Sequence, residues 1–242
     1  MSLKKEELNK IAVEYHDQDV MQDKFIEDEA QFYTYNWVFE QMTDCKTVLE
    51  LGYGEGNFTN ALIERGYTPT VIDGSDLLLQ KAKSIHGDKI NVEHALFEEY
   101  TPTQKFDCVL ATHVLEHVDE PVTLLLQMKK WLTPNGIIVI IVPNKESIHR
   151  QLAVLMGLQP ALDTLGARDH LVGHQRVYSL ETLEADVIES GLKVNETAGF
   201  FLKTLPNSMM LGYSNELVIA LNQISPLMPK NLLANIGLVC SL

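Results

Sequence analysis

Three glycines alternate with other residues directly after a short apolar run. Gly52, Gly54 and Gly56 follow Val48-Leu49-Glu50-Leu51, and an amphipathic stretch begins at Phe58. This order predicts a buried strand, a tight turn and the start of a helix. Glycine allows positive φ and leaves the backbone bare against a ligand. We therefore expect a ligand-binding loop at the carboxyl end of a strand.

Two acidic residues narrow the class of ligand. Glu50 places a carboxylate beside the loop, where it would repel a phosphate and attract an ammonium or sulfonium group. Asp73 ends a second apolar run, where a carboxylate suits ribose hydroxyls. Asn57 stands where the dinucleotide fingerprint G-x-G-x-x-G needs glycine, and no Gly-Lys-Ser/Thr follows as in a P-loop. The sequence predicts an adenosyl ligand with a cationic tail.

The motif Glu50-x-Gly52-x-Gly54-x-Gly56 resembles the first motif of class I S-adenosylmethionine-dependent methyltransferases. Further motifs of that family have counterparts in order between Thr47 and Pro143. They are Asp73, Phe106-Asp107-Cys108-Val109-Leu110 leading into His113-Val114-Leu115-Glu116-His117, and Leu132-Thr133-Pro134-Asn135-Gly136. The Leu-Glu-His after the fourth strand is most similar to quinone-biosynthesis and sugar O-methyltransferases. Tyr53 departs from the family, which usually has a small residue there.

The resemblance implies that S-adenosyl-L-methionine is the cofactor and S-adenosyl-L-homocysteine the product. The glycine loop would hold the methionine end, where Tyr53 would crowd the cofactor or form one wall. Other residues would complete the cofactor site: one group would bind the ribose, an apolar pair would pack against the adenine, and the residues after the fourth strand would contact the cofactor through their backbone. Its expected residues are Glu50, Gly52, Tyr53, Gly54, Gly56, Asp73, Gly74, Ser75, Leu96, Phe97, Thr112 and His113.

Methyl transfer to a hydroxyl needs a base within hydrogen-bond reach of the proton. His113 and His117 follow the fourth predicted strand, and one helical turn would place both imidazoles on one face. In the resembled branch this stretch lies beside cofactor and acceptor, so we predict His117 and His113 as catalytic residues.

The segment 144–178 contains no predicted strand and follows the fifth strand, so it should lie over the active site as a substrate cap. An N-terminal helical lid is predicted at 4–45. Substrate-binding candidates from these two segments are Tyr15, Tyr33, Arg150, His170, His174 and Arg176. Asp169, His170 and His174 suggest a metal site, because His-x-x-x-His can bind metal on a helix. Gly173 disfavours a helix there and spacing fixes no third ligand, so no metal is predicted.

Alternating apolar runs and amphipathic segments predict a doubly wound α/β fold with a mostly parallel seven-stranded sheet. The predicted strands are 47–51, 69–73, 90–95, 106–112, 136–142, 192–200 and 236–242, the last one antiparallel between the fifth and sixth as the resemblance implies. Predicted helices are 56–66, 76–86, 120–132, 180–190 and 214–225. The cofactor core is expected at 46–143 and the rest of the sheet at 179–242, all in one domain.

The composition bounds the partners and the compartment. A net charge of −14 disfavours nucleic acid or an anionic membrane as the main partner. No apolar run is long enough for a membrane helix, and no signal peptide is visible. The three cysteines show no framework spacing, which fits a reducing cytoplasm. We expect a cytoplasmic enzyme with a small-molecule acceptor; oligomeric state is left open.

Several alternative functions remain open at this point. A nicotinamide-dependent oxidoreductase would share Asp73, although no Tyr-x-x-x-Lys pair is present. An N-methyltransferase or a protein methyltransferase would use the same fold, while no basic face supports an RNA substrate. A non-catalytic cofactor-binding protein is the last alternative, because of Tyr53.

Overall fold

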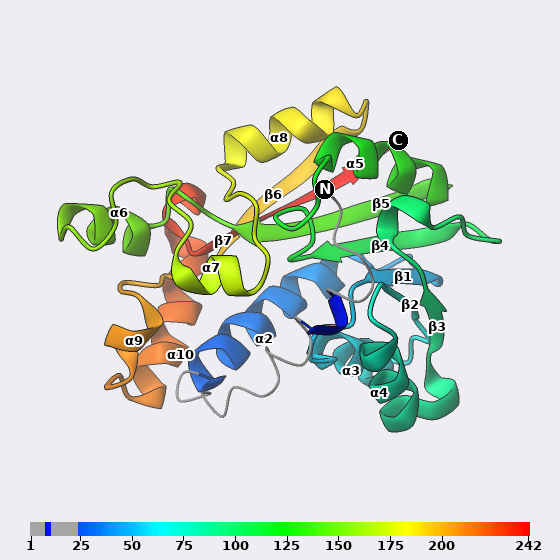
Figure 1. Ribbon diagram of the computed structural model, residues 1–242, viewed down its shortest axis with the longest axis horizontal. Helices are drawn as coiled ribbons and strands as arrows, with labels where there is room; N and C mark the ends of the chain where they lie inside the picture. Colours follow the sequence, from blue (N-terminus) through cyan, green and yellow to red (C-terminus); the bar gives the residue numbers. More distant parts are fainter. Residues whose placement is uncertain (1–7, 11–23) are drawn as a thin grey trace.

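Seven strands and the helices between them form the frame of the computed structural model, which describes residues 8–10 and 24–242 (Figure 1). The strands are β1 (Val48–Leu51), β2 (Thr70–Asp73), β3 (Asn91–His94), β4 (Phe106–Thr112), β5 (Leu132–Pro143), β6 (Lys193–Phe200) and β7 (Asn235–Ser241). The α-helices are α2 (Lys24–Gln41), α3 (Asn57–Glu64), α4 (Asp76–His86), α5 (Pro121–Trp131), α6 (Ile148–Leu155), α7 (Ala167–Leu171), α8 (Leu180–Glu189), α9 (Asn207–Met210) and α10 (Asn215–Ile224).

The strand order is β3-β2-β1-β4-β5-β7-β6. Strands β1 to β5 pair in parallel, whereas β7 is antiparallel to both β5 and β6. The predicted fold class is confirmed, including the insertion of the last strand between the fifth and the sixth.

Both faces of the sheet are buried, as continuous apolar strands require. In β4, Val109 and Ala111 face a core cluster that includes side chains of α5 and α8. Cys108 and Leu110 point to the opposite face, where α2 and α3 contribute to a second cluster. Figure 1 shows α5 and α8 on one side of the sheet and α2, α3 and α4 on the other. This alternation fixes the register of the strands, and the register determines which residues lie at the strand ends.

Strand β5 starts earlier than predicted. Phe106 pairs with Leu132, but Cys108 pairs with Ile137, so β5 contains additional residues opposite β4. The turn predicted at Pro134-Asn135-Gly136 is therefore an irregularity within the paired strand rather than a boundary before it.

The parallel strands end at one edge of the sheet. Glu50 of β1 lies opposite Val71 of β2 and Leu110 of β4, so the residues that follow all three strands meet there. Asp107, at the other end, accepts hydrogen bonds from the Lys46 and Thr47 backbone and ties β4 to the start of β1. The predicted ligand-binding residues therefore lie at the carboxyl edge of the sheet.

Candidate active site

The loop after β1 has the left-handed backbone that its glycines permit. Gly52, Gly54 and Gly56 have φ values of 80°, 53° and 82°, a region that side chains rarely adopt. The Gly52 N–H donates to the carbonyl of Ile72 at 2.8 Å, which fixes the loop to β2. The backbone of the loop can therefore approach a ligand without intervening side chains.

Tyr53 packs beneath this loop. Only 3% of the residue is exposed, its ring joins a cluster with Val71 and Leu79, and its hydroxyl lies 3.1 Å from Nε2 of His86. A Cβ added at Gly56 would lie 2.4 Å from the Tyr53 hydroxyl. The large side chain thus supports the loop from the α4 side, and Tyr53 also lines the cavity described below.

Two buried acids flank the loop. Glu50 accepts a hydrogen bond from the Thr59 hydroxyl at 2.8 Å, and burial raises its pKa to about 8, with the Asp73 charge adding to the effect. Asp73 accepts from the N–H of Tyr53 at 2.9 Å and from that of Ser75 at 2.7 Å. Burial raises the pKa of Asp73 as well, although these backbone donors oppose it.

A cavity of about 1320 Å³ lies along this edge of the sheet. All twelve predicted cofactor-site residues line it, from the glycine loop through Asp73 and the Leu96-Phe97 pair to Thr112 and His113. His117, Arg150 and His174 line the same cavity. One space therefore unites the predicted cofactor residues with part of the predicted acceptor site.

Other predicted substrate residues lie elsewhere. Tyr33 and His170 are not among the residues that line the cavity, and His170 is exposed. Arg176 also lies outside the lining and binds backbone carbonyls. Tyr15 lies outside the described residues.

The described N-terminal residues lie against the predicted ribose site. The Ser75 hydroxyl donates to Oδ1 of Asn9 at 2.6 Å, and Nδ2 of Asn9 donates to Asp76 at 2.6 Å. Leu8 lines the cavity beside Gly74. These contacts suit the predicted N-terminal lid.

The turn after β4 carries the predicted catalytic histidines. His113 has a φ of 56°, unusual for a residue with a side chain, and its N–H donates to Ile141 at 2.7 Å. The residues after it form a turn and not the expected helical turn. Arg176 holds the turn by donating to the carbonyls of Leu115, Val118 and Asp119.

Glu116 lies at the centre of these histidines and is fully buried. Its Oε1 is 3.2 Å from Nδ1 of His113. Burial works to raise the Glu116 pKa, but His113, His117 and His174 outweigh it and lower that pKa. The same burial works to lower the pKa of His113, yet Glu116 raises it. Burial lowers the pKa of His117, so its imidazole is neutral near pH 7.

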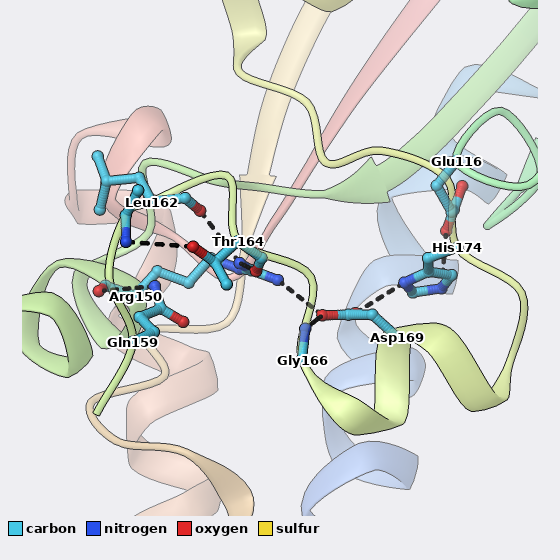
Figure 2. A network of polar contacts seen from close by, with 9 residues as sticks. Glu116, Arg150, Gln159, Leu162, Thr164, Gly166, Asp169 and His174 are labelled. Carbon is cyan, nitrogen blue, oxygen red and sulfur yellow. Dashed lines mark hydrogen bonds and ion pairs between the residues drawn. The ribbon is translucent and has the colours of Figure 1, made fainter. Parts of the chain in front are cut away.

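A polar network connects the cap to this turn (Figure 2). Arg150 donates to the carbonyls of Leu162 and Thr164 and to Asp169 at 3.2 Å. Asp169 accepts from Nδ1 of His174 at 2.8 Å, and the His174 ring lies 4.7 Å from that of His117. Arg150, predicted to bind substrate, thus has donors already engaged within the cap.

Sequence reasoning missed several residues of the site. Glu116 and Asp169 form the network, and His149, Glu27 and Tyr35 line the cavity. His149 is neutral because burial lowers its pKa to about 2, and its Nδ1 has no partner among the described residues. A signal for Glu116 existed, since an acid lies between two histidines in an apolar stretch. The predicted lid includes α2 and the predicted cap includes His149 and Asp169, but no local pattern assigns Glu27, Tyr35, His149 or Asp169 to the cavity.

None of the helices in the described ranges is long and apolar enough to cross a membrane.

The family model described as "Methyltransferase domain" matches residues 24–197. A ubiquinone biosynthesis O-methyltransferase of Pasteurella multocida is 30% identical over 139 residues, covering 52% of this chain and 57% of that protein. Its counterpart in Psychrobacter arcticus is 27% identical over 169 residues, covering 66% of this chain and 64% of that protein. The chain thus spans less than two thirds of these curated relatives.

A solved structure gives the same assignment of the fold. The 1,6-didemethyltoxoflavin-N1-methyltransferase of Burkholderia thailandensis, with bound 1,6-didemethyltoxoflavin and S-adenosylhomocysteine, superposes with a TM-score of 0.58. The superposition covers 95% of this chain and 84% of that one at 15% sequence identity, so it shows similarity of fold alone. The family model matches well over half of the chain. This chain therefore belongs to the methyltransferase domain family and has the fold of S-adenosylmethionine-dependent methyltransferases.

Proposed function

We propose that this chain transfers a methyl group from S-adenosylmethionine to a hydroxyl oxygen of a small-molecule acceptor. The observation that carries the proposal is the single cavity that joins the glycine loop and its acids to the histidines after β4. Family membership and relatives named as O-methyltransferases support the same reaction.

The residues around the loop fit the proposed cofactor. Glu50 lies beside bare glycine backbone with one oxygen hydrogen-bonded to Thr59, and it is mostly protonated near pH 7 in the ligand-free chain. A cationic amino-acid group bound beside it would favour the ionised carboxylate. Asp73 suits the ribose hydroxyls, and Leu96 with Phe97 offers an apolar edge to a base. When bound, the cofactor supplies a methyl group already activated on sulfur.

The chain's own task is then to position the acceptor, exclude water and remove a proton. His117 lines the cavity and carries a neutral imidazole near pH 7, so it can accept the proton of an acceptor hydroxyl. The Arg176 contacts and the strained backbone at His113 hold the turn that presents it.

Calorimetric titration with S-adenosylhomocysteine beside NADH tests the cofactor. We expect S-adenosylhomocysteine alone to bind, and Asp73→Asn to weaken it, because the amide supplies only one acceptor oxygen where the carboxylate supplies two. A panel of phenols, sugars and amines, assayed for methyl transfer with labelled cofactor, then identifies the acceptor. Binding of NADH in place of S-adenosylhomocysteine would contradict the proposal, and methylation of amines only would contradict its oxygen acceptor.

A further inference from the structure

A carboxylate and two imidazoles converge behind the acceptor end of the cavity. Glu116, His117 and His174 each offer one donor atom, and these three atoms all lie within 4.8 Å of one another. Glu116 and His117 belong to the turn after β4, whereas His174 comes from the cap 57 residues after His117. Folding alone brings the three together.

The hydrogen bonds of His174 direct one ring nitrogen toward this cluster. Nδ1 lies 2.8 Å from Oδ1 of Asp169, and a carboxylate only accepts, so Nδ1 carries the proton. Asp169 is itself fixed by Arg150 at 3.2 Å and by the Gly166 N–H at 2.8 Å (Figure 2). In the neutral imidazole the lone pair is therefore on Nε2.

That lone pair faces another acceptor. Nε2 of His174 lies 4.0 Å from Oε1 of Glu116. The second oxygen of Glu116, Oε2, is buried and has no hydrogen-bond partner among the described residues. A buried carboxylate oxygen without a hydrogen-bond donor destabilises the fold. A cation between Glu116 and His174 would interact favourably with both the carboxylate and the lone pair of Nε2.

The surroundings match those of metal-binding histidines. Such a histidine commonly donates its other N–H to a carboxylate or a backbone carbonyl, which fixes the tautomer. Asp169 does this for His174. The pair that the sequence suggested, His170 with His174, is not the one assembled, since His170 is exposed and Asp169 supports a ligand instead.

We propose that Glu116, His117 and His174 bind a divalent transition-metal ion, specifically Zn²⁺, with a coordination position open to the cavity. Two imidazoles and one carboxylate suit zinc, whereas Mg²⁺ and Ca²⁺ prefer oxygen ligands alone. Tetrahedral zinc with bonds of about 2.0–2.1 Å holds its donors roughly 3.4 Å apart, so small side-chain movements close the site. Zinc would take up the lone pair of His117, so His117 could act as the base proposed above only in the zinc-free chain. Zinc binding is measured without cofactor or acceptor, so its failure is distinguishable from a failure of methyl transfer.

Titration of the chelator-treated chain with Zn²⁺ tests the site. We expect one equivalent to bind and Tm to rise with zinc, because the ion binds the folded state. His174→Gln should lower the affinity at least a hundredfold, and Asp169→Asn about 10–100-fold, because it orients the ligand without touching the ion. His170→Gln, on the same cap segment but exposed, is the matched control and should leave zinc binding unchanged.

X-ray absorption at the zinc edge on the wild-type chain provides a readout that needs no variant. Two imidazoles in the first shell are expected. Absence of stoichiometric binding, or equal affinity in wild type and His174→Gln, would overturn the proposal.

Discussion

At the scale of single residues, two buried glutamates behave in opposite ways. Glu50 and Glu116 are 2% and 0% exposed. Burial raises the pKa of Glu50 to about 8, with the like charge of Asp73 adding to the rise and the Thr59 hydroxyl opposing it. Glu116 lies among three imidazoles, which lower its pKa despite burial. The neighbours, and not the residue type, decide which acid is charged.

Glu50 should make stability fall with rising pH. Its folded pKa of about 8 exceeds its ordinary value of 4.5, so folded chains retain a proton that unfolded chains release. The free energy of unfolding contributed by this group is therefore lost as pH rises through that window. Glu50→Gln keeps an acceptor for Thr59, and its advantage in Tm over wild type should grow by on the order of 5 °C from pH 5 to pH 8.

Calorimetry of unfolding across this pH range checks the Glu50 prediction. Glu64→Gln, an exposed site on α3, is the matched control and should show no comparable trend. A constant difference in Tm between Glu50→Gln and wild type would refute the raised pKa.

His117→Asn in the chelator-treated, zinc-free chain tests the proposed base. The asparagine side chain retains hydrogen bonding but cannot accept a proton at neutral pH, so kcat should fall about 10²–10⁴-fold. Steady-state kinetics with an identified acceptor measures the fall. Affinity for S-adenosylhomocysteine should change less than about threefold, which separates this effect from a collapsed cofactor site. A kcat within tenfold of wild type would remove His117 from the role of base.

At the scale of elements, the glycine loop depends on the side chain beneath it. A methyl group at Gly56 would meet both a φ of 82° and the Tyr53 ring. We expect Gly56→Ala to destabilise the chain by about 2 kcal/mol or more and to abolish binding of S-adenosylhomocysteine.

Gly66→Ala is the matched control for this loop. Gly66 has a similar φ of 87°, but no atom lies within 4 Å of an added Cβ. It should show the backbone strain alone, with cofactor binding intact. Thermal denaturation and calorimetric titration of both variants check the pair, and normal binding by Gly56→Ala would show that the close packing is not needed.

At the scale of the whole molecule, the cavity is bounded by segments from most of the chain. Glu27 of α2, the strand ends, Asp169 of the cap and Asn235 of β7 all line it. The packing of α2 against α9 includes a hydrogen bond of 2.9 Å from Asn207 to Glu27. A bound ligand therefore contacts several elements at once and should stabilise the fold as a unit.

S-adenosylhomocysteine at a hundred times its Kd should add about 2.7 kcal/mol to the free energy of unfolding. For a chain of this size, that corresponds to a rise in Tm of roughly 5–10 °C. Thermal denaturation with increasing ligand checks the prediction, with NADH as the comparison compound. An equal rise with NADH would show that the cavity does not select the adenosyl ligand proposed here.

The sequence by itself determined most of the strands, the α/β fold class and the glycine loop with its two acids, and the family resemblance added the place of the last strand and the other residues along the carboxyl edge of the sheet. These features are local: an apolar run, three glycines and an acid at a strand end can be recognised within a few residues. Even the early start of β5 was hidden only because its irregular pairing depends on β4.

Tertiary structure alone decided the surroundings of the acceptor end. That Tyr53 packs under the loop, that Arg176 holds the turn after β4 and that His174 meets Glu116 depend on contacts between segments distant in sequence. His170 and His174 have the same residue type four positions apart, yet only His174 reaches the cavity. Packing of the cap against the sheet makes that choice, because burial and pairing depend on the assembled fold and not on local pattern.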